Sequence, residues 1–329
     1  MPCVLVTGGA GYIGSHTVHE LTDAGYEILI YDNLEKGHPA AVPNYRLVVG
    51  DLHDGLKLDR VMQEFGVESV VHFAAYIEAG ESVQDPGKYF QNNTAGTLSL
   101  LQAMVRNDVK QLVFSSTAAV YGEPERVPIE EGDRKAPTNA YGLSKWMVEE
   151  MLDWFQRAYG LRSVSLRYFN AAGAHPGGEI GEDHRPETHL IPLILQVPLG
   201  KREKVYIFGE DYDTPDGTCI RDYIHVMDLA SAHVLALKAL ERGVEREAFN
   251  VGNGAGFSVR QVIEVARQVT GHPIPAEVKP RRAGDPARLI AGSEKLRREL
   301  GWQPKYPDLQ QIVGSAWAWF RTHPDGYRS

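Results

Sequence analysis

Tyr141 and Lys145 are the side chains whose types and spacing most directly indicate chemistry in this sequence. They stand four positions apart in the segment AYGLSKWMVEE, residues 140–150. On a helix, residues four apart project from the same face, one turn from each other. A phenol has an ordinary pKa near about 10, so it acts as a base near neutral pH only when a nearby cation favours the phenolate. The pair therefore indicates proton transfer, although an isolated pair of this kind more often has the Tyr packed in a core.

A glycine-rich segment near the start of the chain indicates a bound dinucleotide. The stretch VTGGAGYIGSH contains Gly9-x-Gly11-x-x-Gly14 and the overlapping pattern Gly8-x-x-Gly11-x-x-Gly14. It follows an expected strand and opens an expected helix, which is the context that gives such glycines meaning. They allow a tight turn and bring the backbone close to a pyrophosphate at the helix N-terminus.

Asp32 ends the next expected strand, EILIYDN. A carboxylate there can accept hydrogen bonds from both hydroxyls of an adenosine ribose, and its charge would repel a 2′-phosphate. The sequence therefore favours NAD over NADP. Asp51, at the end of the third expected strand, is a candidate for the adenine edge, but it could equally cap the following helix.

The elements that must position these residues alternate between strands and helices. Apolar runs predict strands at 3–8, 27–33, 46–51, 69–75, 111–117 and 162–169, and periodic stretches predict helices at 12–24, 54–65, 87–106 and 141–159. Continuously apolar strands separated by helices are typical of a parallel sheet covered on both faces, the doubly wound α/β or Rossmann arrangement. Ligands bind beyond the carboxyl ends of such strands. We therefore expect three segments to meet there: Phe73-Ala74-Ala75, Ser115-Ser116-Thr117 and the helix bearing Tyr141.

The pattern changes from about residue 171. The stretch AAGAHPGGEIGEDHRPETH, residues 171–189, is rich in Gly, Pro and charge, which is typical of a long loop between two lobes. We expect residues 1–173 to form the NAD-binding domain, with segments near 220–252 returning to it. Residues 174–329 are expected to form a smaller, mixed α/β lobe that binds substrate.

One helix of this second lobe has both of its ends marked in the sequence. Ser258 is followed three residues later by Gln261, which is the spacing of a capping box. Gly271 follows the last periodic residue, so we expect the helix to end there.

Composition and charge exclude several classes of function. The 329 residues are 43% hydrophobic and 23% charged, which is ordinary for a soluble globular protein. A net charge of −9 argues against a broad nucleic-acid or anionic-membrane surface, so an anionic ligand needs locally placed Arg or Lys. No apolar run approaches the about 20 residues that a bilayer span requires. The two cysteines, Cys3 and Cys219, fit a reducing compartment, and the expected location is the cytoplasm.

Taken together, the motifs resemble the extended short-chain dehydrogenase/reductase family, and within it the enzymes that invert C4 of UDP-hexoses. The similarity covers nearly the whole chain and rests on VTGGAGYIGSHT, YDNL, HFAA…GESV, NNTAGT, FSSTAAVYG, AYGLSK, LRYFNAAGAHP, HLIP, GTCIRDYIHVMDLA, FNVGNG, RRAGDPA and LGW. It implies an isomerase that interconverts UDP-glucose and UDP-galactose through a transient 4-keto sugar, with hydride passed to tightly bound NAD and returned. It also implies a homodimer formed by the helices near 90–105 and 141–159, and no metal.

The resemblance further implies a role for each site residue. Tyr141 would take the proton from the sugar 4-hydroxyl, Lys145 would hold the nicotinamide ribose and lower the Tyr pKa, and Thr117 would supply a hydroxyl. Arg221 and Arg282 would clamp the diphosphate, with Asp285 on the uridine ribose. The implied cofactor-binding residues are Gly8, Gly11, Tyr12, Ile13, Asp32, Asn33, Asp51, Leu52, Phe73, Ala74, Ala75, Asn92, Ser115, Tyr141, Lys145 and Tyr168, and Asn93 would line the same cleft. The implied substrate-binding residues are Thr117, Tyr141, Phe169, Asn170, His189, Leu190, Arg221, Tyr223, Arg282, Asp285 and Leu289.

Two positions depart from the family pattern. Ile77 stands where some relatives carry a Lys near the nicotinamide ribose. Leu289 replaces a bulky Tyr found in members restricted to unmodified hexoses. The smaller side chain at 289 could admit UDP-N-acetylglucosamine and UDP-N-acetylgalactosamine as further substrates.

Two other functions are possible on the same scaffold. A nucleotide-sugar 4,6-dehydratase, a lyase, needs an acid and a base after the Ser-Thr strand end, where this chain has Ala118 and Ala119. A non-catalytic NAD-sensing protein would keep the fold. Such a protein would typically lack the Tyr or the Lys of the pair, and both are present here.

Overall fold

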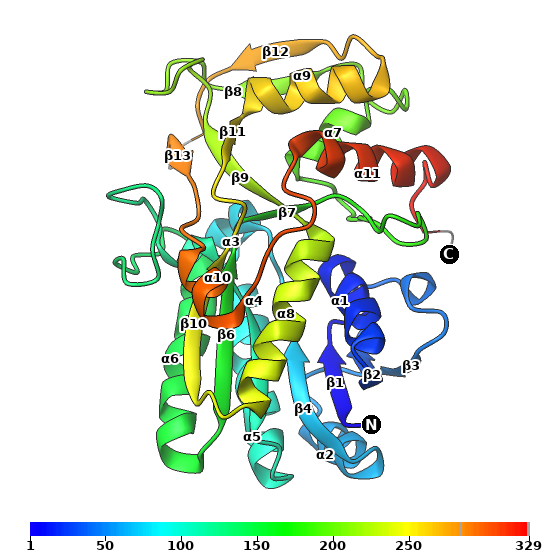
Figure 1. The fold of residues 1–329 in the computed structure, drawn as a ribbon, viewed down its shortest axis with the longest axis vertical. Helices are drawn as coiled ribbons and strands as arrows, with labels where there is room; N and C mark the ends of the chain where they lie inside the picture. Colours follow the sequence, from blue (N-terminus) through cyan, green and yellow to red (C-terminus); the bar gives the residue numbers. More distant parts are fainter. Residues whose placement is uncertain (283–284, 328–329) are drawn as a thin grey trace.

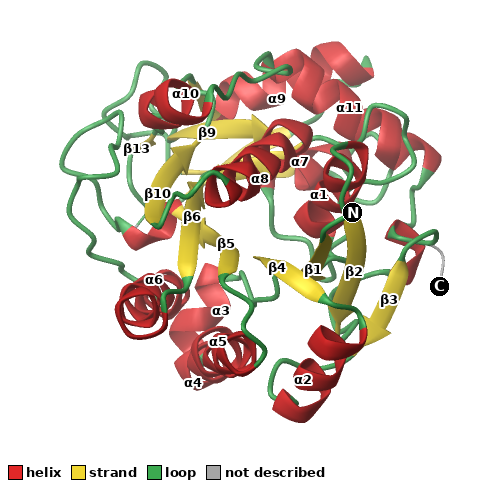
Figure 2. Ribbon diagram, turned by 60° about the horizontal axis from the view of Figure 1, so that its bottom comes forward, coloured by secondary structure: helices red, strands yellow, loops and turns green. Residues whose placement is uncertain are grey.

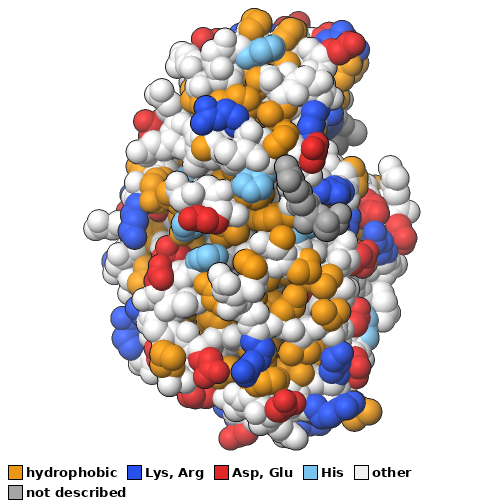
Figure 3. Space-filling model, turned by 90° about the vertical axis from the view of Figure 1, so that its right-hand side faces the viewer, with side chains coloured by type: hydrophobic (Ala, Val, Ile, Leu, Met, Phe, Trp, Pro, Cys, Tyr) orange, Lys and Arg blue, Asp and Glu red, His pale blue; other side chains and the backbone are white. Residues whose placement is uncertain are grey.

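The computed structural model describes residues 1–282 and 285–327. A large parallel sheet and its helices make up the lower part of Figure 1, and a smaller mixed lobe lies above it. No helix in the described part of the chain is long and apolar enough to cross a membrane. On the face drawn in Figure 3, Lys and Arg side chains are scattered among Asp and Glu, as the acidic composition predicts.

The large sheet has seven parallel strands in the order β10-β6-β5-β4-β1-β2-β3. Their bounds are β1 Cys3–Thr7, β2 Glu27–Asp32, β3 Arg46–Val49, β4 Val67–His72, β5 Gln111–Thr117, β6 Arg162–Tyr168 and β10 Arg246–Val251. Strands β1 and β5 are buried over nearly their whole length, which explains their continuous apolar character. All six predicted strands are present, and the doubly wound α/β prediction is confirmed.

Helices cover both faces of this sheet, as Figure 2 shows. On one face, α1 (Tyr12–Asp23) and α8 (Val226–Glu241) share a hydrophobic core with the strands. On the other face, the core is formed by α2 (Gly55–Glu64), α5 (Gly96–Arg106) and α6 (Ala140–Tyr159). Strand β10 and helix α8 come from the second half of the sequence. The chain therefore returns to the large sheet after it has entered the smaller lobe.

The helix expected at 87–106 is present in the structure and contains a π-helical turn. The region consists of α3 (Ala79–Gln84), α4 (Pro86–Tyr89), a π-helical turn (Phe90–Ala95) and α5. The Asn93 side chain explains the turn, because its Oδ1 accepts from Tyr76 N (2.9 Å) and its Nδ2 donates to Tyr76 O (3.0 Å) and Ser144 Oγ (3.1 Å). Such turns often occur at functional sites, and Asn92 beside it lines the cleft described below.

The smaller lobe combines two short sheets with three helices around its own core. Its four-stranded sheet contains β7 (Asn170–Ala172), β9 (Ile220–His225), β11 (Gly256–Ser258) and β13 (Arg288–Leu289), and its two-stranded sheet contains β8 (Val205–Phe208) and β12 (Ala276–Lys279). The helices are α7 (Leu190–Leu195), α9 (Val259–Thr270) and α11 (Leu309–Thr322), while α10 (Glu294–Leu300) packs on β10. The division of the chain at residue 173 stays a prediction.

The two ends of α9 lie where the sequence places them. The Ser258 hydroxyl accepts from Gln261 N, and the Gln261 side chain accepts from Ser258 N, so the capping box is formed. Gly271 ends the helix with a φ of 68°. Both predictions are confirmed, because capping depends on neighbours within one turn.

Four buried histidines make the fold sensitive to acid. Burial lowers the pKa of His16 and His72 to about 3 and of His225 and His233 to about 4. In the unfolded chain the imidazole pKa is about 6.5. Between pH about 6.5 and about 4, the unfolded chain therefore binds protons that the folded protein does not, and the free energy of unfolding falls as pH falls.

We therefore expect the midpoint of thermal unfolding to fall steadily from pH 6.5 to pH 4.5. His233→Leu should flatten this dependence, because Nε2 of His233 is buried without a hydrogen-bond partner among the described residues. His53→Gln, at an exposed position, is the matched control and should keep the parent slope. Calorimetric scans at several pH values measure the effect, and equal slopes for the parent and His233→Leu would contradict it.

Candidate active site

A cleft of about 330 Å³ opens at the carboxyl ends of the strands of the large sheet. Its walls come from the ends of β1 to β6, the start of α6 and the loop that contains Glu182, His184 and His189. A doubly wound sheet is expected to bind its ligand at this edge.

The glycine segment forms one end of the cleft and fits a pyrophosphate. A Cβ on Gly8, which has a φ of +71°, would lie 2.5 Å from Ala74 N, and a Cβ on Gly14 would lie 2.3 Å from Gly8 O. Only glycine allows these backbone approaches at the N-terminus of α1. The residues present therefore fit the diphosphate of a dinucleotide.

Asp32 is fixed beside this turn. Its carboxylate accepts from Ala10 N (3.0 Å) and Leu34 N (2.9 Å), and burial raises its pKa although these two hydrogen bonds lower it. The side chain lines the cleft at the end of β2. It is therefore held where a ribose hydroxyl pair can be bound.

Tyr141 and Thr117 meet at the wall of the same cleft. Burial raises the pKa of the Tyr141 phenol, and the hydrogen bond with the Thr117 hydroxyl lowers it in part. Lys145 Nζ donates to Ser115 O (2.8 Å) and lies 5.0 Å from the centre of the Phe114 ring. Burial lowers the Lys145 pKa to about 7. Burial has the largest effect on the Tyr141 pKa, and the role of Lys145 toward the phenol stays a prediction.

Helix α6 is anchored by a buried ion pair one turn beyond Lys145. Glu149 follows Tyr141 and Lys145 on the same helix face and accepts from Arg167 Nε (2.9 Å to Oε1) and from Ser116 Oγ (2.6 Å). Arg167 belongs to β6 and Ser116 to β5, so the pair joins the helix to both strands beneath the cleft. These bonds fix the position of α6, and with it the Tyr141 side chain, relative to the carboxyl ends of β5 and β6.

The start of α6 is fixed as tightly as its middle. The Asn139 side chain caps the helix by accepting from Gly142 N (2.8 Å). A Cβ on Gly142 would lie 2.6 Å from Ala119 O, so the helix approaches the turn that follows β5 at a distance that only glycine allows. The first turn therefore brings Tyr141 next to Thr117.

The predicted cofactor residues lie together. All of them line the cleft except Ser115 and Lys145, which are buried beneath it. Ser115 Oγ and Tyr168 OH are 2.5 Å apart, which links β5 to the cleft wall. Their roles toward NAD stay predictions.

The predicted substrate residues are more dispersed. Thr117, Tyr141, Phe169, Asn170 and His189 line the cleft. The remainder lie outside its lining: Leu190, Arg221, Tyr223, Arg282, Asp285 and Leu289.

The two arginines predicted to bind the diphosphate, Arg221 and Arg282, contact other side chains of the protein. Arg221 Nη2 lies 2.5 Å from Asp285 Oδ1, so the cation assigned to the diphosphate is paired with the carboxylate assigned to the uridine ribose. The Arg282 guanidinium lies 3.9 Å from the centre of the Phe208 ring. For the predicted roles, both arginines must turn toward the ligand.

Several residues that line the cleft were missed by the sequence argument. Tyr76, Glu78 and Lys36 line it near Ile77, with Lys36 Nζ 3.5 Å from Glu78 Oε1. A cation therefore borders the cleft although position 77 is Ile. These residues belong to no motif. They lie at the cleft because of the path that the loops after β2 and β4 take.

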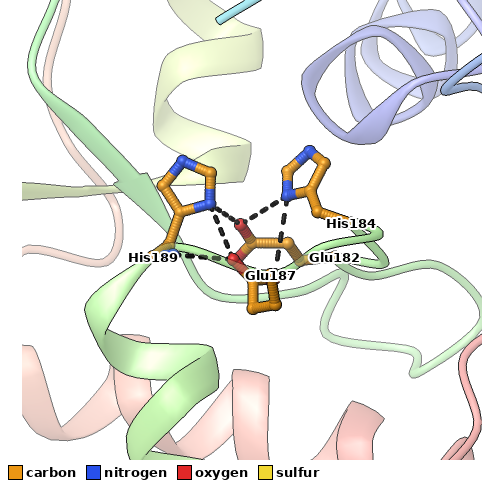
Figure 4. A group of neighbouring side chains, drawn as sticks. All are labelled: Glu182, His184, Glu187 and His189. Carbon is orange, nitrogen blue, oxygen red and sulfur yellow. Dashed lines mark hydrogen bonds and ion pairs between the residues drawn. The ribbon is translucent and has the colours of Figure 1, made fainter. Parts of the chain in front are cut away.

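Glu182 and His184 were also missed, within a segment interpreted only as a loop. Figure 4 shows the His184 and His189 rings turning one nitrogen each toward the carboxylates of Glu182 and Glu187. Burial opposes charge on the imidazoles, but the two carboxylates raise the pKa of both. The alternation of Glu and His in GEDHRPETH was the available signal.

Comparisons with known proteins agree with this geometry. Residues 4–252 match the NAD dependent epimerase/dehydratase family. The chain is 58% identical over 324 residues to a UDP-glucose 4-epimerase of Halalkalibacterium halodurans, covering 98% of this chain and 97% of the relative. It resembles the crystal structure of UDP-glucose 4-epimerase from Brucella ovis in complex with NAD, with 46% identity, a TM-score of 0.94 and coverage of 96% and 98%. It also resembles the UDP-Glc/GlcNAc 4-epimerase of Campylobacter jejuni, with 43% identity, a TM-score of 0.87 and coverage of 98% and 100%.

Proposed function

The chain belongs to the NAD dependent epimerase/dehydratase family, and we propose that it is an NAD-dependent UDP-glucose 4-epimerase, which interconverts UDP-glucose and UDP-galactose. The observation that carries the proposal is that Tyr141 and Thr117 line one cleft together with the glycine turn. Oxidation of an alcohol carbon needs a base for the hydroxyl proton and a dinucleotide for the hydride, and this cleft offers a place for both. The relatives described above carry the same activity in their names.

The mechanism assigns a step to each side chain at this wall. When bound, NAD supplies the acceptor and then the donor of hydride at the sugar C4. Tyr141 takes the proton of the 4-hydroxyl and later returns a proton to the same oxygen, O4, when the opposite face of the 4-keto carbon is reduced, with the Thr117 hydroxyl orienting that oxygen. Between the two steps the hexose must turn over within the cleft. Phe169, Asn170 and His189 form the wall against which it would turn.

A dehydratase on this scaffold lacks support in the residues after β5. Ala118 and Ala119 offer no proton carrier for removal of water from C5 and C6. The carboxylate that acts on the Tyr141 pKa, Glu78, already accepts from Tyr89 OH and lies beside Lys36. An elimination would therefore have no acid and base at the required place.

Incubation with UDP-galactose alone tests the proposal. UDP-glucose should accumulate to equilibrium without consumption of added NAD, because the hydride returns to the sugar from which it came. A 4-keto-6-deoxy sugar would instead identify a dehydratase, and no reaction would favour an NAD-sensing protein. Either result would overturn the proposal.

We further propose that the enzyme accepts UDP-N-acetylglucosamine and UDP-N-acetylgalactosamine. Leu289 lies in β13 in register with Arg221 of β9, and it packs with Phe169 against a small hydrophobic cluster. Phe169 lines the cleft, and the bulk at 289 would act on the sugar site through the cluster against which both side chains pack. The C. jejuni relative is named for both kinds of substrate.

Leu289→Tyr is therefore expected to lower kcat/KM for UDP-N-acetylglucosamine by about tenfold or more, because a pocket discriminates by size at about 1–3 kcal/mol for each small group. Activity on UDP-glucose should change much less. Leu289→Met, which keeps the volume, is the control. Equal losses on both substrates would contradict a role in selecting the sugar.

A homodimer built through α5 and α6 is part of the proposal. Leu143, Met147 and Trp154 share one face of α6 and are 38%, 41% and 65% exposed, which leaves an apolar stripe for a second copy. Sedimentation equilibrium, which gives the mass in solution, tests this. The two unpaired cysteines, Cys3 and Cys219, support the proposal of a cytoplasmic enzyme.

A further inference from the structure

Four side chains with metal-binding chemistry meet in the loop between β7 and α7. One ligand atom from each of Glu182, His184, Glu187 and His189 lies within 4.8 Å of the others. Within residues 1–282 and 285–327, no other group of three or more His, Cys, Asp or Glu side chains meets this condition. None of the four takes or gives a proton in the proposed mechanism, although His189 also lines the cleft.

We propose that Glu182, His184, Glu187 and His189 bind one divalent cation with the chemistry of zinc, and that this ion fastens the loop between β7 and α7. Carboxylate oxygen and imidazole nitrogen are ligands that zinc accepts, and four ligands from the protein complete a structural site.

The spacing of the ligand atoms is close to that of a tetrahedral site. His184 Nδ1 and His189 Nδ1 each lie 3.0 Å from Glu182 Oε1, and His189 Nδ1 lies 2.9 Å from Glu187 Oε1. His184 Nδ1 lies 3.8 Å from Glu187 Oε2. A tetrahedral zinc ion with bonds of about 2.0–2.1 Å has ligand atoms about 3.3 Å apart. Shifts of about half an ångström in these side chains would therefore suffice.

The charges of the group suit a divalent ion. The two carboxylates carry two negative charges in a place where Glu182 is only 3% exposed. A dication held by two carboxylates and two neutral imidazoles is electrically balanced, as buried charges must be. The alternative balance is a proton on each imidazole, which gives a hydrogen-bonded network without an ion.

The backbone around the group holds two of its ligands in place. Glu187 Oε1 accepts from Thr188 N and His189 N, both at 2.7 Å, so its carboxylate is fixed before any ion binds. The carbonyl oxygen of Glu182 accepts from Trp319 Nε1 (3.3 Å). Partners of this kind orient ligands and raise metal affinity.

An ion can reach the group from the surface. A second cavity, of about 120 Å³, is lined by Glu182, His184 and Glu187. Glu182 and His184 also line the main cleft, so the group forms a wall between the two spaces. Because the protein supplies all four ligands, no position is left open for substrate, and the ion acts on the loop and not on the sugar.

The test uses untagged holoenzyme treated with a chelator and then titrated with zinc chloride alone. We expect one zinc per chain after gel filtration, measured by elemental mass spectrometry, with a dissociation constant of about 10 µM or tighter. Bound zinc should raise the unfolding midpoint by several degrees. Cobalt(II) in place of zinc should give the intense visible absorption of a tetrahedral ion, and an anomalous difference map at the zinc edge should place the peak among the four side chains.

His184→Gln should weaken zinc binding by about 100-fold or more, since it removes one ligand. His175→Gln is the matched control, because His175 Nδ1 contacts only one carboxylate of the same loop, Glu179 Oε2, at 2.7 Å. That variant should bind zinc as the parent does. Circular dichroism establishes that each variant is folded, and the anomalous map of the parent decides the question if His184→Gln is not.

Zinc bound equally by the parent and His184→Gln, or an anomalous peak elsewhere, would overturn the proposal. So would a parent that retains no zinc. The group would then be a network held by imidazole protons only. None of these results bears on the epimerase activity, which is measured separately with UDP-galactose.

Discussion

Tyr141→Phe is expected to lower kcat for the UDP-galactose to UDP-glucose reaction by about 10²- to 10⁴-fold, the usual contribution of a positioned general base. The change removes only the phenol oxygen that would take the proton from the 4-hydroxyl. Tyr141 is 9% exposed and packs at the start of α6, where a phenyl ring keeps the same contacts. A coupled assay for UDP-glucose measures the loss.

Cofactor content separates loss of chemistry from loss of binding. NAD released by denaturing the purified variant should match the parent, because the glycine turn and Asp32 are untouched. Tyr76→Phe is the matched control, since Tyr76 lines the same cleft and its hydroxyl donates to Glu35 Oε2 (2.6 Å). Undiminished turnover by Tyr141→Phe would disprove the assignment of the base.

Local sequence patterns predict the large sheet well. Strands such as β1 and β5 are apolar throughout because both of their faces are covered, and that pattern is visible without tertiary information. Strand β10 is harder to predict, because Arg246–Val251 is half polar and becomes a strand by pairing with β6. The helix expected at 87–106 is present, but its π-helical turn is not predictable from the pattern, since the bonds of Asn93 to Tyr76 and Ser144 are tertiary.

The candidate site divides in the same way. The glycine turn, Asp32 and the pair of Tyr141 and Lys145 are predictable, because each depends on spacing within one element and on where parallel strands end. Pairings between distant segments are not predictable from such spacing. Arg221 and Asp285 are 64 positions apart, and only the pairing of β13 with β9 brings them together.

The electrostatic environment of Lys145 could not be predicted from the sequence either. A Lys four residues after a Tyr suggests an ammonium beside a phenol, but its pKa depends on burial, which is set by β5 and α6 together. The structure buries Lys145 to 3% exposure and lowers its pKa to about 7. Such a group is costly to the fold and is retained where function needs it.

Lys145→Met is therefore expected to lower kcat by about 100-fold or more without lowering the stability of the fold. Turnover should fall because the nicotinamide ribose loses its predicted partner and the Tyr141 phenolate loses a nearby cation. Stability should hold or rise, since Met fills a similar volume without the cost of burying an amine. The assay for UDP-glucose and thermal unfolding, both with NAD in excess, measure the two effects.

If Lys145→Met stabilises the fold, the pH dependence of the rise in its unfolding midpoint identifies the cause. The Lys145 pKa is about 7 in the folded protein and about 10.4 in an unfolded chain. The cost of the buried amine is complete below pH 7 and declines as pH rises toward 10, because the folded protein then holds the neutral form. The difference in unfolding midpoint between Lys145→Met and the parent should therefore shrink between pH 7 and pH 10. Lys88→Met, at a partly exposed ion pair with Glu81, should show no such trend. A gain that is constant with pH would mean that Met acts through packing alone, and that burial does not lower the Lys145 pKa.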